Sequence, residues 1–109
     1  GDFDQARRNY QRSYEIRKAF DDSEGMAVAL NGLGNVALSE QRYGEAEEMY
    51  GRSRAIYQEI GDRGGLARAL DGLGNAAAEK GNHSSAQSYY SEALTISEQI
   101  HFDPLTLAF

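Results

Sequence analysis

The sequence predicts an all-α protein, a solenoid of antiparallel helix pairs with five helices and the start of a sixth. Three observations predict it. Residues 21–60 and 61–100 align without a gap and are identical at 14 of 40 positions, so one structural unit occurs twice. Apolar residues recur three or four positions apart in each unit, and the two-residue alternation of a strand is absent. A single proline, Pro104, leaves long stretches free to be helical.

The first three helices are predicted at residues 4–20, 23–40 and 44–60. The first segment matches the second half of the unit, because Ala6, Tyr10, Arg12, Ser13 and Ile16 align with Ala46, Tyr50, Arg52, Ser53 and Ile56. The second gathers one face at i, i+3, i+4 and i+7, formed by Leu30, Leu33, Gly34 and Ala37. The third carries a similar stripe, formed by Ala46, Tyr50, Ser53, Ile56 and Ile60. Gly61 follows it as a left-handed cap.

The remaining elements repeat this arrangement. Helix 63–80 copies 23–40 and is followed by Gly81, where a left-handed cap is again expected. Helix 84–100 copies 44–60, and its start has the capping-box pattern of Ser84 with Gln87. Asp103 before Pro104 indicates an N-cap and a first-turn proline, which begin a sixth helix. We therefore expect one array over 1–109: a half unit (1–20), two whole units (21–60, 61–100) and the start of another (101–109).

Composition excludes several classes of function. The 109 residues include no cysteine, which removes disulfides, thiolate zinc sites and cysteine nucleophiles. The longest apolar run, Met26–Leu30, is far shorter than the roughly 20 residues that cross a bilayer, and no signal sequence is visible, so we expect a cytoplasmic protein. The net charge of −6 argues against nucleic-acid binding. The basic residues within 1–20 are expected to form a solvated helix face.

No catalytic, metal or cofactor site is expected. The only histidines are His83 and His101. His83 occupies a turn position that carries aromatic residues in the other copies, which indicates packing, and His101 with Asp103 supplies only two metal ligands. The Gly32-Leu33-Gly34 segment lies inside a predicted helix, so it lacks the geometry of a phosphate-binding loop. We therefore expect a protein that is not an enzyme.

The repeated motif resembles the tetratricopeptide repeat (TPR) family. In each unit a large apolar residue precedes a Leu-Gly pair, and an alanine, an aromatic and a small residue follow in the second helix, as in that family. The packing signature is Leu30, Leu33, Gly34, Ala46 and Tyr50 in one copy and Leu70, Leu73, Gly74, Ala86 and Tyr90 in the next. The period is 40 rather than 34, and no proline ends the second helix. This departure is similar to a long-repeat subclass found in kinesin light chains, spindle-orientation adaptors and bacterial multidomain regulators. The resemblance implies a right-handed superhelix.

Small residues and tyrosines are expected to pack the repeats together. Gly34 and Gly74 are expected to let the second helix approach closely at Ala46 and Ala86. Tyr10, Tyr50 and Tyr90 occupy one repeated position, which we expect to be core.

The resemblance also implies a binding surface. In TPR proteins the exposed face of the first helices lines a concave groove for extended peptides, and here that face carries Asn31, Asn35, Arg68, Asp71, Asn75 and Glu79. Asn35 and Asn75 match the family's groove asparagine, whose amide both donates to and accepts from a peptide main chain. Gly32 and Gly72 would leave room for a ligand backbone. An equal alternative is that the asparagines bond to neighbouring repeats and fix the superhelix.

Three functions remain open at this point. The first is a scaffold that binds a partner peptide or helix in the groove, and the acidic balance of residues 21–109 favours a basic partner. The second is self-association through exposed terminal residues, namely Tyr14 and Ile16 at one end and Leu105, Leu107 and Phe109 at the other. The third, which depends on the resemblance alone, is a set of peptide-sensing repeats in a larger bacterial signalling or transcription regulator.

Overall fold

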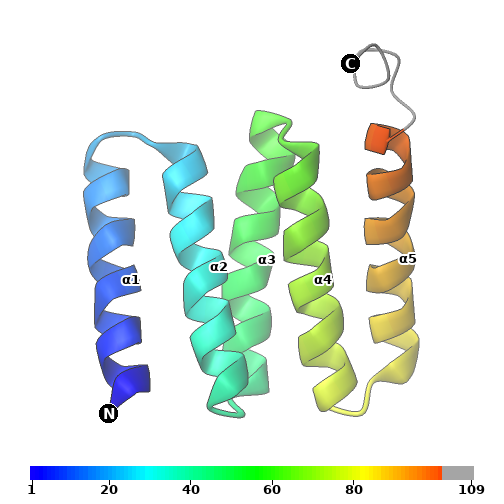
Figure 1. The fold of residues 1–109 in the computed structure, drawn as a ribbon, viewed down its shortest axis with the longest axis horizontal. Coiled ribbons are helices and arrows are strands. Elements are labelled where there is room, and N and C mark those ends of the chain that lie inside the picture. The colour runs from blue at the N-terminus through cyan, green and yellow to red at the C-terminus, as the bar shows by residue number, and fades with distance from the viewer. Residues whose placement is uncertain (102–109) are drawn as a thin grey trace.

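The computed structural model describes residues 1–101, which form five helices in a row (Figure 1). Helix α1 spans Asp2–Ala19, α2 Ser23–Ser39, α3 Tyr43–Ile60, α4 Arg63–Glu79 and α5 His83–His101. Each helix packs against the next along the chain, and α2 also touches α4. The predicted all-α solenoid of helix pairs is therefore confirmed. The sixth helix expected at Asp103 and Pro104 lies outside the described residues.

Each turn between two helices contains one residue in the left-handed region, and these residues follow each other at intervals of 20 positions, half a repeat. These residues are Asp21, Gln41, Gly61 and Gly81, with φ of 53°, 64°, 75° and 87°. The left-handed turns predicted at Gly61 and Gly81 are confirmed. Asp21 and Gln41 adopt the same conformation although they lack the conformational freedom of glycine.

The starts of α2 and α4 are capped in the same way. Asp22 accepts a hydrogen bond from the Gly25 N–H at 2.9 Å, and Asp62 accepts one from the Gly65 N–H at 2.9 Å. Each carboxylate thus satisfies a donor that has no partner within the helix. The capping box predicted at Ser84 is wrong, because α5 begins at His83 and Ser84 lies inside its first turn.

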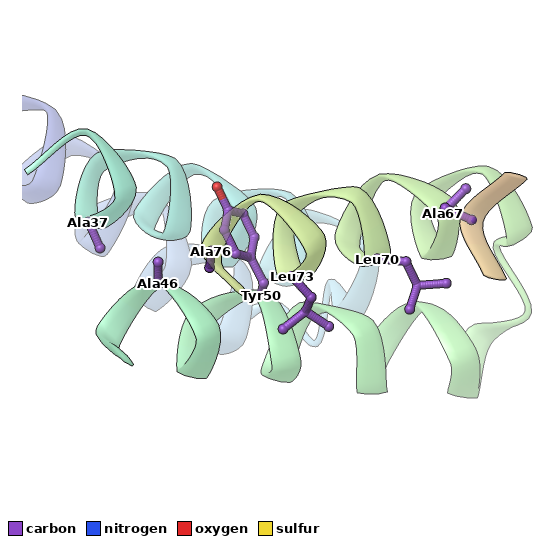
Figure 2. Packing of buried hydrophobic residues seen from close by; sticks show 8 residues of the cluster. Ala37, Ala46, Tyr50, Ala67, Leu70, Leu73 and Ala76 are labelled. Carbon is purple, nitrogen blue, oxygen red and sulfur yellow. The ribbon is translucent and has the colours of Figure 1, made fainter. Parts of the chain in front are cut away.

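The core consists of small side chains around a buried tyrosine (Figure 2). Tyr50 is 2% exposed, and its ring lies between Gly34 of α2 and Gly72 of α4. A Cβ atom at Gly34 or Gly72 would come within 2.7 or 2.5 Å of that ring. Gly74 faces the ring of Tyr90 in the same way. These glycines therefore make room for aromatic rings, whereas we had expected Gly34 and Gly74 to admit the neighbouring helix itself.

Tyr10 and Tyr90 differ from Tyr50 in burial. They are 38% and 39% exposed, so the prediction of three core tyrosines is right only for Tyr50. The reason is that this ring position is flanked by two first helices, and only Tyr50 has both of them within residues 1–101. Of the other members of the predicted packing signature, Leu33 is half-buried, and seven are buried: Leu30, Gly34, Ala46, Leu70, Leu73, Gly74 and Ala86.

Ion pairs join each second helix to the first helix of the adjacent hairpin. Arg7 of α1 pairs with Glu40 at the end of α2, and Glu47 of α3 pairs with Lys80 at the end of α4, with 2.8 Å between Lys80 Nζ and Glu47 Oε1. The two pairs occupy equivalent positions 40 residues apart, but their polarity is reversed. The same site in the repeat thus carries opposite charges in successive copies.

A further contact links α1 to α3. The guanidinium of Arg52 lies 5.3 Å from the ring centre of Tyr14, and its Nη2 donates a hydrogen bond to the Tyr14 hydroxyl at 2.9 Å. Tyr14, which we expected to be exposed, is therefore half-buried. Ile16 is 49% exposed, as expected.

Candidate functional site

A hollow of about 310 Å³ lies beside α2, toward α4. We call it the groove pocket, and it is lined by Tyr10, Val28, Asn31, Gly32, Asn35, Tyr57 and Arg68. Three of the six residues predicted for a groove, Asn31, Asn35 and Arg68, thus meet in one place. The other three, Asp71, Asn75 and Glu79, do not line it.

Helical spacing explains why α2 supplies most of the lining. Val28, Asn31 and Asn35 follow each other at three- and four-residue intervals, so they share one face of the helix. Leu30 and Ala37 lie in the core and are almost fully buried. The core contacts of α2 therefore fix which of its residues face the pocket.

Asn35 is held by a hydrogen bond within its own hairpin. The Tyr50 hydroxyl donates to Asn35 Oδ1 at 2.5 Å, and the Tyr90 hydroxyl donates to Asn75 Oδ1 at 2.5 Å. Burial raises the pKa of Tyr50 to about 12, so its hydroxyl stays protonated and acts as the donor. The oxygen of each asparagine is thus bonded within its own repeat and not to a neighbouring one. The amide N–H₂ group and the second lone pair of that oxygen remain for a ligand.

The other polar groups of the pocket, on Asn31 and Arg68, differ in burial. Asn31 Oδ1 is buried and has no hydrogen-bond partner. Arg68 is exposed and forms no ion pair within residues 1–101. The lining includes no carboxylate, so the pocket combines donors from Asn35 and Arg68 with one buried acceptor. A peptide group, which has one N–H and one carbonyl, matches this combination.

The predicted residues outside the pocket have other surroundings. Asp71 is exposed, and Glu79 accepts a hydrogen bond from the Tyr43 hydroxyl at 3.5 Å. The prediction that Gly72 leaves room for a ligand backbone is wrong, because the ring of Tyr50 fills the space beside it. Gly32 lines the groove pocket, although the ring of Tyr10 lies where its Cβ would stand.

Three lining residues, Tyr10, Val28 and Tyr57, are not among those predicted for the groove. Tyr10 is predicted to be core, and the counterparts of Tyr57 in the other copies are Arg17 and Ser97. Tyr57 is 1% exposed, and its ring lies against Gly65. The break in the repeat at position 57 was the signal that could have identified it.

Within residues 1–101 no three histidine, aspartate or glutamate side chains gather where they could hold a metal ion. His83 is exposed, so its predicted packing role is wrong: at the first position of α5 it lies at the molecular surface. None of the described helices has the length and apolar character of a membrane span.

Comparison with known proteins gives one finding about the whole array. A family model described as tetratricopeptide repeat matches the chain twice, over residues 1–59 and over residues 25–99, and the two matches overlap. The two matches together extend over α1 to α5. A comparison with curated proteins gave no match.

Proposed function

The chain belongs to the tetratricopeptide repeat family, and we propose that it is a non-catalytic scaffold that holds an extended segment of a partner protein in the groove pocket. Repeats of this family are generally protein–protein interaction modules. We infer that the groove pocket is the surface that binds, and that it recognises the main chain of the partner.

The observation that carries the proposal is that three polar side chains of the pocket, Asn31, Asn35 and Arg68, each have a group without a partner within residues 1–101. A buried oxygen without a hydrogen bond, such as Asn31 Oδ1, destabilises the chain by roughly 1–3 kcal/mol. The peptide carbonyl would accept from the amide of Asn35 or from Arg68, both of which are exposed. A shift of the Asn31 side chain on binding would bring its buried oxygen to a peptide N–H. Tyr10, Val28 and Tyr57 supply apolar surface beside these groups.

The test uses a phage-displayed library of random peptides selected on residues 1–109, followed by titration of the selected peptides. Asn35→Ala and Arg68→Ala are each expected to weaken binding about tenfold, since one lost hydrogen bond to a desolvated group is worth about 1.4 kcal/mol. Asn75→Ala is the matched control. It removes the same bond to a tyrosine hydroxyl but lies outside the pocket, so it should leave binding unchanged.

Equal affinity of the selected peptides for wild type and both pocket variants would contradict the proposal. So would a selection that yields no peptide. An equal loss in Asn75→Ala would show that the asparagines act through the packing of Tyr50 and Tyr90 instead of through the ligand.

Self-association is the second candidate function, and exposed apolar side chains favour it. Ile16 on α1 is 49% exposed, Phe20 directly after α1 is 80% exposed, and Leu94 on α5 is 60% exposed. Sedimentation at increasing concentration tests it. A dimer that Phe20→Ser or Leu94→Ser abolishes would support this function, and a monomer at high concentration would contradict it.

We also propose that the chain falls within the long-repeat subclass similar to kinesin light chains, spindle-orientation adaptors and bacterial regulators, and that it acts in the cytoplasm. The 40-residue spacing of Tyr10, Tyr50 and Tyr90 and the absence of a proline that ends the second helix support the first point. The absence of cysteine is compatible with the second.

A further inference from the structure

A second hollow, of about 270 Å³, lies between α1 and the start of α2. We call it the N-terminal pocket, and it is lined by Ser13, Arg17, Asp22, Glu24, Gly25 and Val28. Val28 also lines the groove pocket and is 52% exposed, so the two pockets adjoin across its side chain. None of these residues was assigned to a site above, except Val28.

The next repeat shows what occupies the equivalent place there. Forty residues on, Arg17 and Gly25 correspond to Tyr57 and Gly65. The ring of Tyr57 lies directly on Gly65, and neither has room for a further group, because a Cβ at Gly65 would overlap the ring. Tyr57 is one of the most deeply buried side chains of the molecule, in a cluster with Ala27 and Ala69.

In the earlier copy Gly25 is present, but Arg17 stands where the next copy has the ring of Tyr57. Two side chains cover Gly25 instead: the carboxylate of Asp22, and the aliphatic part of Arg17, whose Cδ lies 2.7 Å from where a Cβ would stand. The Arg17 guanidinium reaches aside to Asp22, at 3.2 Å between Nη1 and Oδ2. The hollow therefore opens at the place where the next repeat holds an aromatic side chain.

We propose that the N-terminal pocket binds an aromatic side chain of the partner, one that carries a hydrogen-bond donor, tryptophan or tyrosine. The ring would stack on the guanidinium of Arg17 and contact Val28, in the manner of a cation–π pair. The indole N–H or phenol O–H would donate to Glu24, an exposed carboxylate without an ion pair within residues 1–101. This inference rests on the proposed function in one respect, since the same peptide continues over Val28 into the groove pocket.

The first experiment uses a small probe, so that it does not depend on an identified partner. N-acetyl-tryptophanamide is titrated at millimolar concentration into ¹⁵N-labelled protein. Amide shifts are expected at Ser13, Gly25 and Val28. The chain contains no tryptophan, so a blue shift of the emission reports only on the probe. N-acetyl-phenylalaninamide, which lacks the ring donor, is expected to bind several-fold more weakly.

The decisive variant is Arg17→Tyr, which gives the first repeat the ring that the next one already has. It is expected to fill the pocket and abolish the probe-induced shifts while the helix content is unchanged. Arg8→Tyr, the same substitution at an exposed position of α1 outside both pockets, is the matched control and should bind the probe like wild type. Glu24→Ala is a second variant, at an exposed position with little risk to folding. Because it removes the acceptor, it should erase the preference for tryptophan over phenylalanine.

Three results would overturn the aromatic pocket: no shifts in wild type, shifts that persist in Arg17→Tyr, or shifts confined to other helices. The same experiments distinguish failure of the aromatic pocket from failure of the groove proposal. Selected peptides that lose affinity in Asn35→Ala but not in Arg17→Tyr would retain the groove and remove the aromatic anchor. Probe binding that is lost only in Arg17→Tyr, together with no peptide selected, would retain the pocket and remove the groove.

Discussion

Gln41 carries backbone strain that its counterpart in the next repeat avoids. Its φ of 64° is left-handed, a conformation that costs a side-chain-bearing residue roughly 1–2 kcal/mol, whereas Gly81 occupies the equivalent turn. A glycine at position 41 would remove this strain. It would also make the unfolded chain more flexible, which offsets part of the gain in stability. We therefore expect Gln41→Gly to raise the free energy of unfolding by about 0.5–1 kcal/mol, measured by urea denaturation.

The control for this prediction is Gly61→Ala. Gly61 has φ of 75°, and a Cβ there would meet no atom within 4 Å, so the substitution adds only backbone strain. It should lower the free energy of unfolding by about 1 kcal/mol. A destabilised Gln41→Gly variant would show that the Gln41 side chain contributes more than its turn costs.

The buried hydroxyl of Tyr50 predicts a loss of stability in alkali. Its pKa is raised from 10.0 to about 12 in the folded chain, because burial disfavours the phenolate. The folded state therefore binds the proton more tightly than the unfolded state. The stabilisation is complete below pH 10 and is lost as the pH rises from 10 to 12, by up to about 2–3 kcal/mol at 1.36 kcal/mol per pKa unit. Urea denaturation across this range measures it, and Tyr50→Phe should show a flatter dependence.

Residue-level contacts were the least predictable from the sequence. Helical periodicity was enough to place Asn31 and Asn35 on one face of α2. That Arg68 of α4 lies beside them was implied by the family resemblance, which implied the same for Asp71, Asn75 and Glu79, and these do not line the pocket. The partner of Asn35 was not predictable, since it required the position of a ring on another helix, 15 residues away. The same holds for Gly32 and Gly72, whose missing side chains matter only because of the tyrosines that fill the space.

At the scale of the helix, the reversed ion pairs specify which helices associate. Arg7 with Glu40 and Glu47 with Lys80 are both attractive, but a chain displaced by one repeat would oppose Arg7 to Lys80 and Glu47 to Glu40. Like charges in these positions repel, so the wrong register is disfavoured without any contribution from shape. Periodic sequences need such a device, because their apolar stripes alone do not distinguish one copy from the next.

The prediction that follows concerns the pair between α3 and α4. Glu47→Lys should lower the free energy of unfolding by about 0.5–1 kcal/mol, because it places two cations together at a partly exposed site. Adding Lys80→Glu should restore most of the loss, and a double-mutant cycle in urea measures the coupling. High salt should shrink the effect. A double variant no more stable than Glu47→Lys would show that the pair does not join the two helices energetically.

Helix boundaries illustrate how far element-level prediction extended. Ala19, Ser39, Ile60 and Glu79, where α1 to α4 end, lie within one residue of the predicted ends, because the left-handed turn residue recurs every half repeat. The start of α5 was misplaced at Ser84. A serine at a helix start is a strong capping signal in isolation, but the chain enters α5 one residue earlier, as it enters α3 at Tyr43.

At the scale of the whole molecule, the gapless internal repeat predicted the architecture, since similar hairpins that each leave one face uncovered stack on one another. What it did not predict is that burial varies along the array. Tyr10, Tyr50 and Tyr90 are equivalent in sequence, yet only the ring of Tyr50 is enclosed, between Gly34 and Gly72. The two pockets likewise arise where the copies differ, at Arg17 and Tyr57.

This unequal burial predicts unequal consequences for one substitution. Tyr50→Ala removes a ring that α2, α3 and α4 share, and truncating a buried aromatic residue costs about 3–5 kcal/mol, so we expect the chain to be largely unfolded or to melt at much lower temperature. Tyr90→Ala removes a ring that is 39% exposed and packs on Gly74 of α4, so the loss should be about 1–2 kcal/mol. Thermal denaturation followed by circular dichroism compares them. Since nearest-neighbour contacts couple the hairpins, Tyr50→Ala should also broaden the transition, as α1 and α2 melt separately from α4 and α5. Equal losses in the two variants would mean that Tyr50 does not couple the halves of the array, and that each hairpin is stabilised by its own contacts.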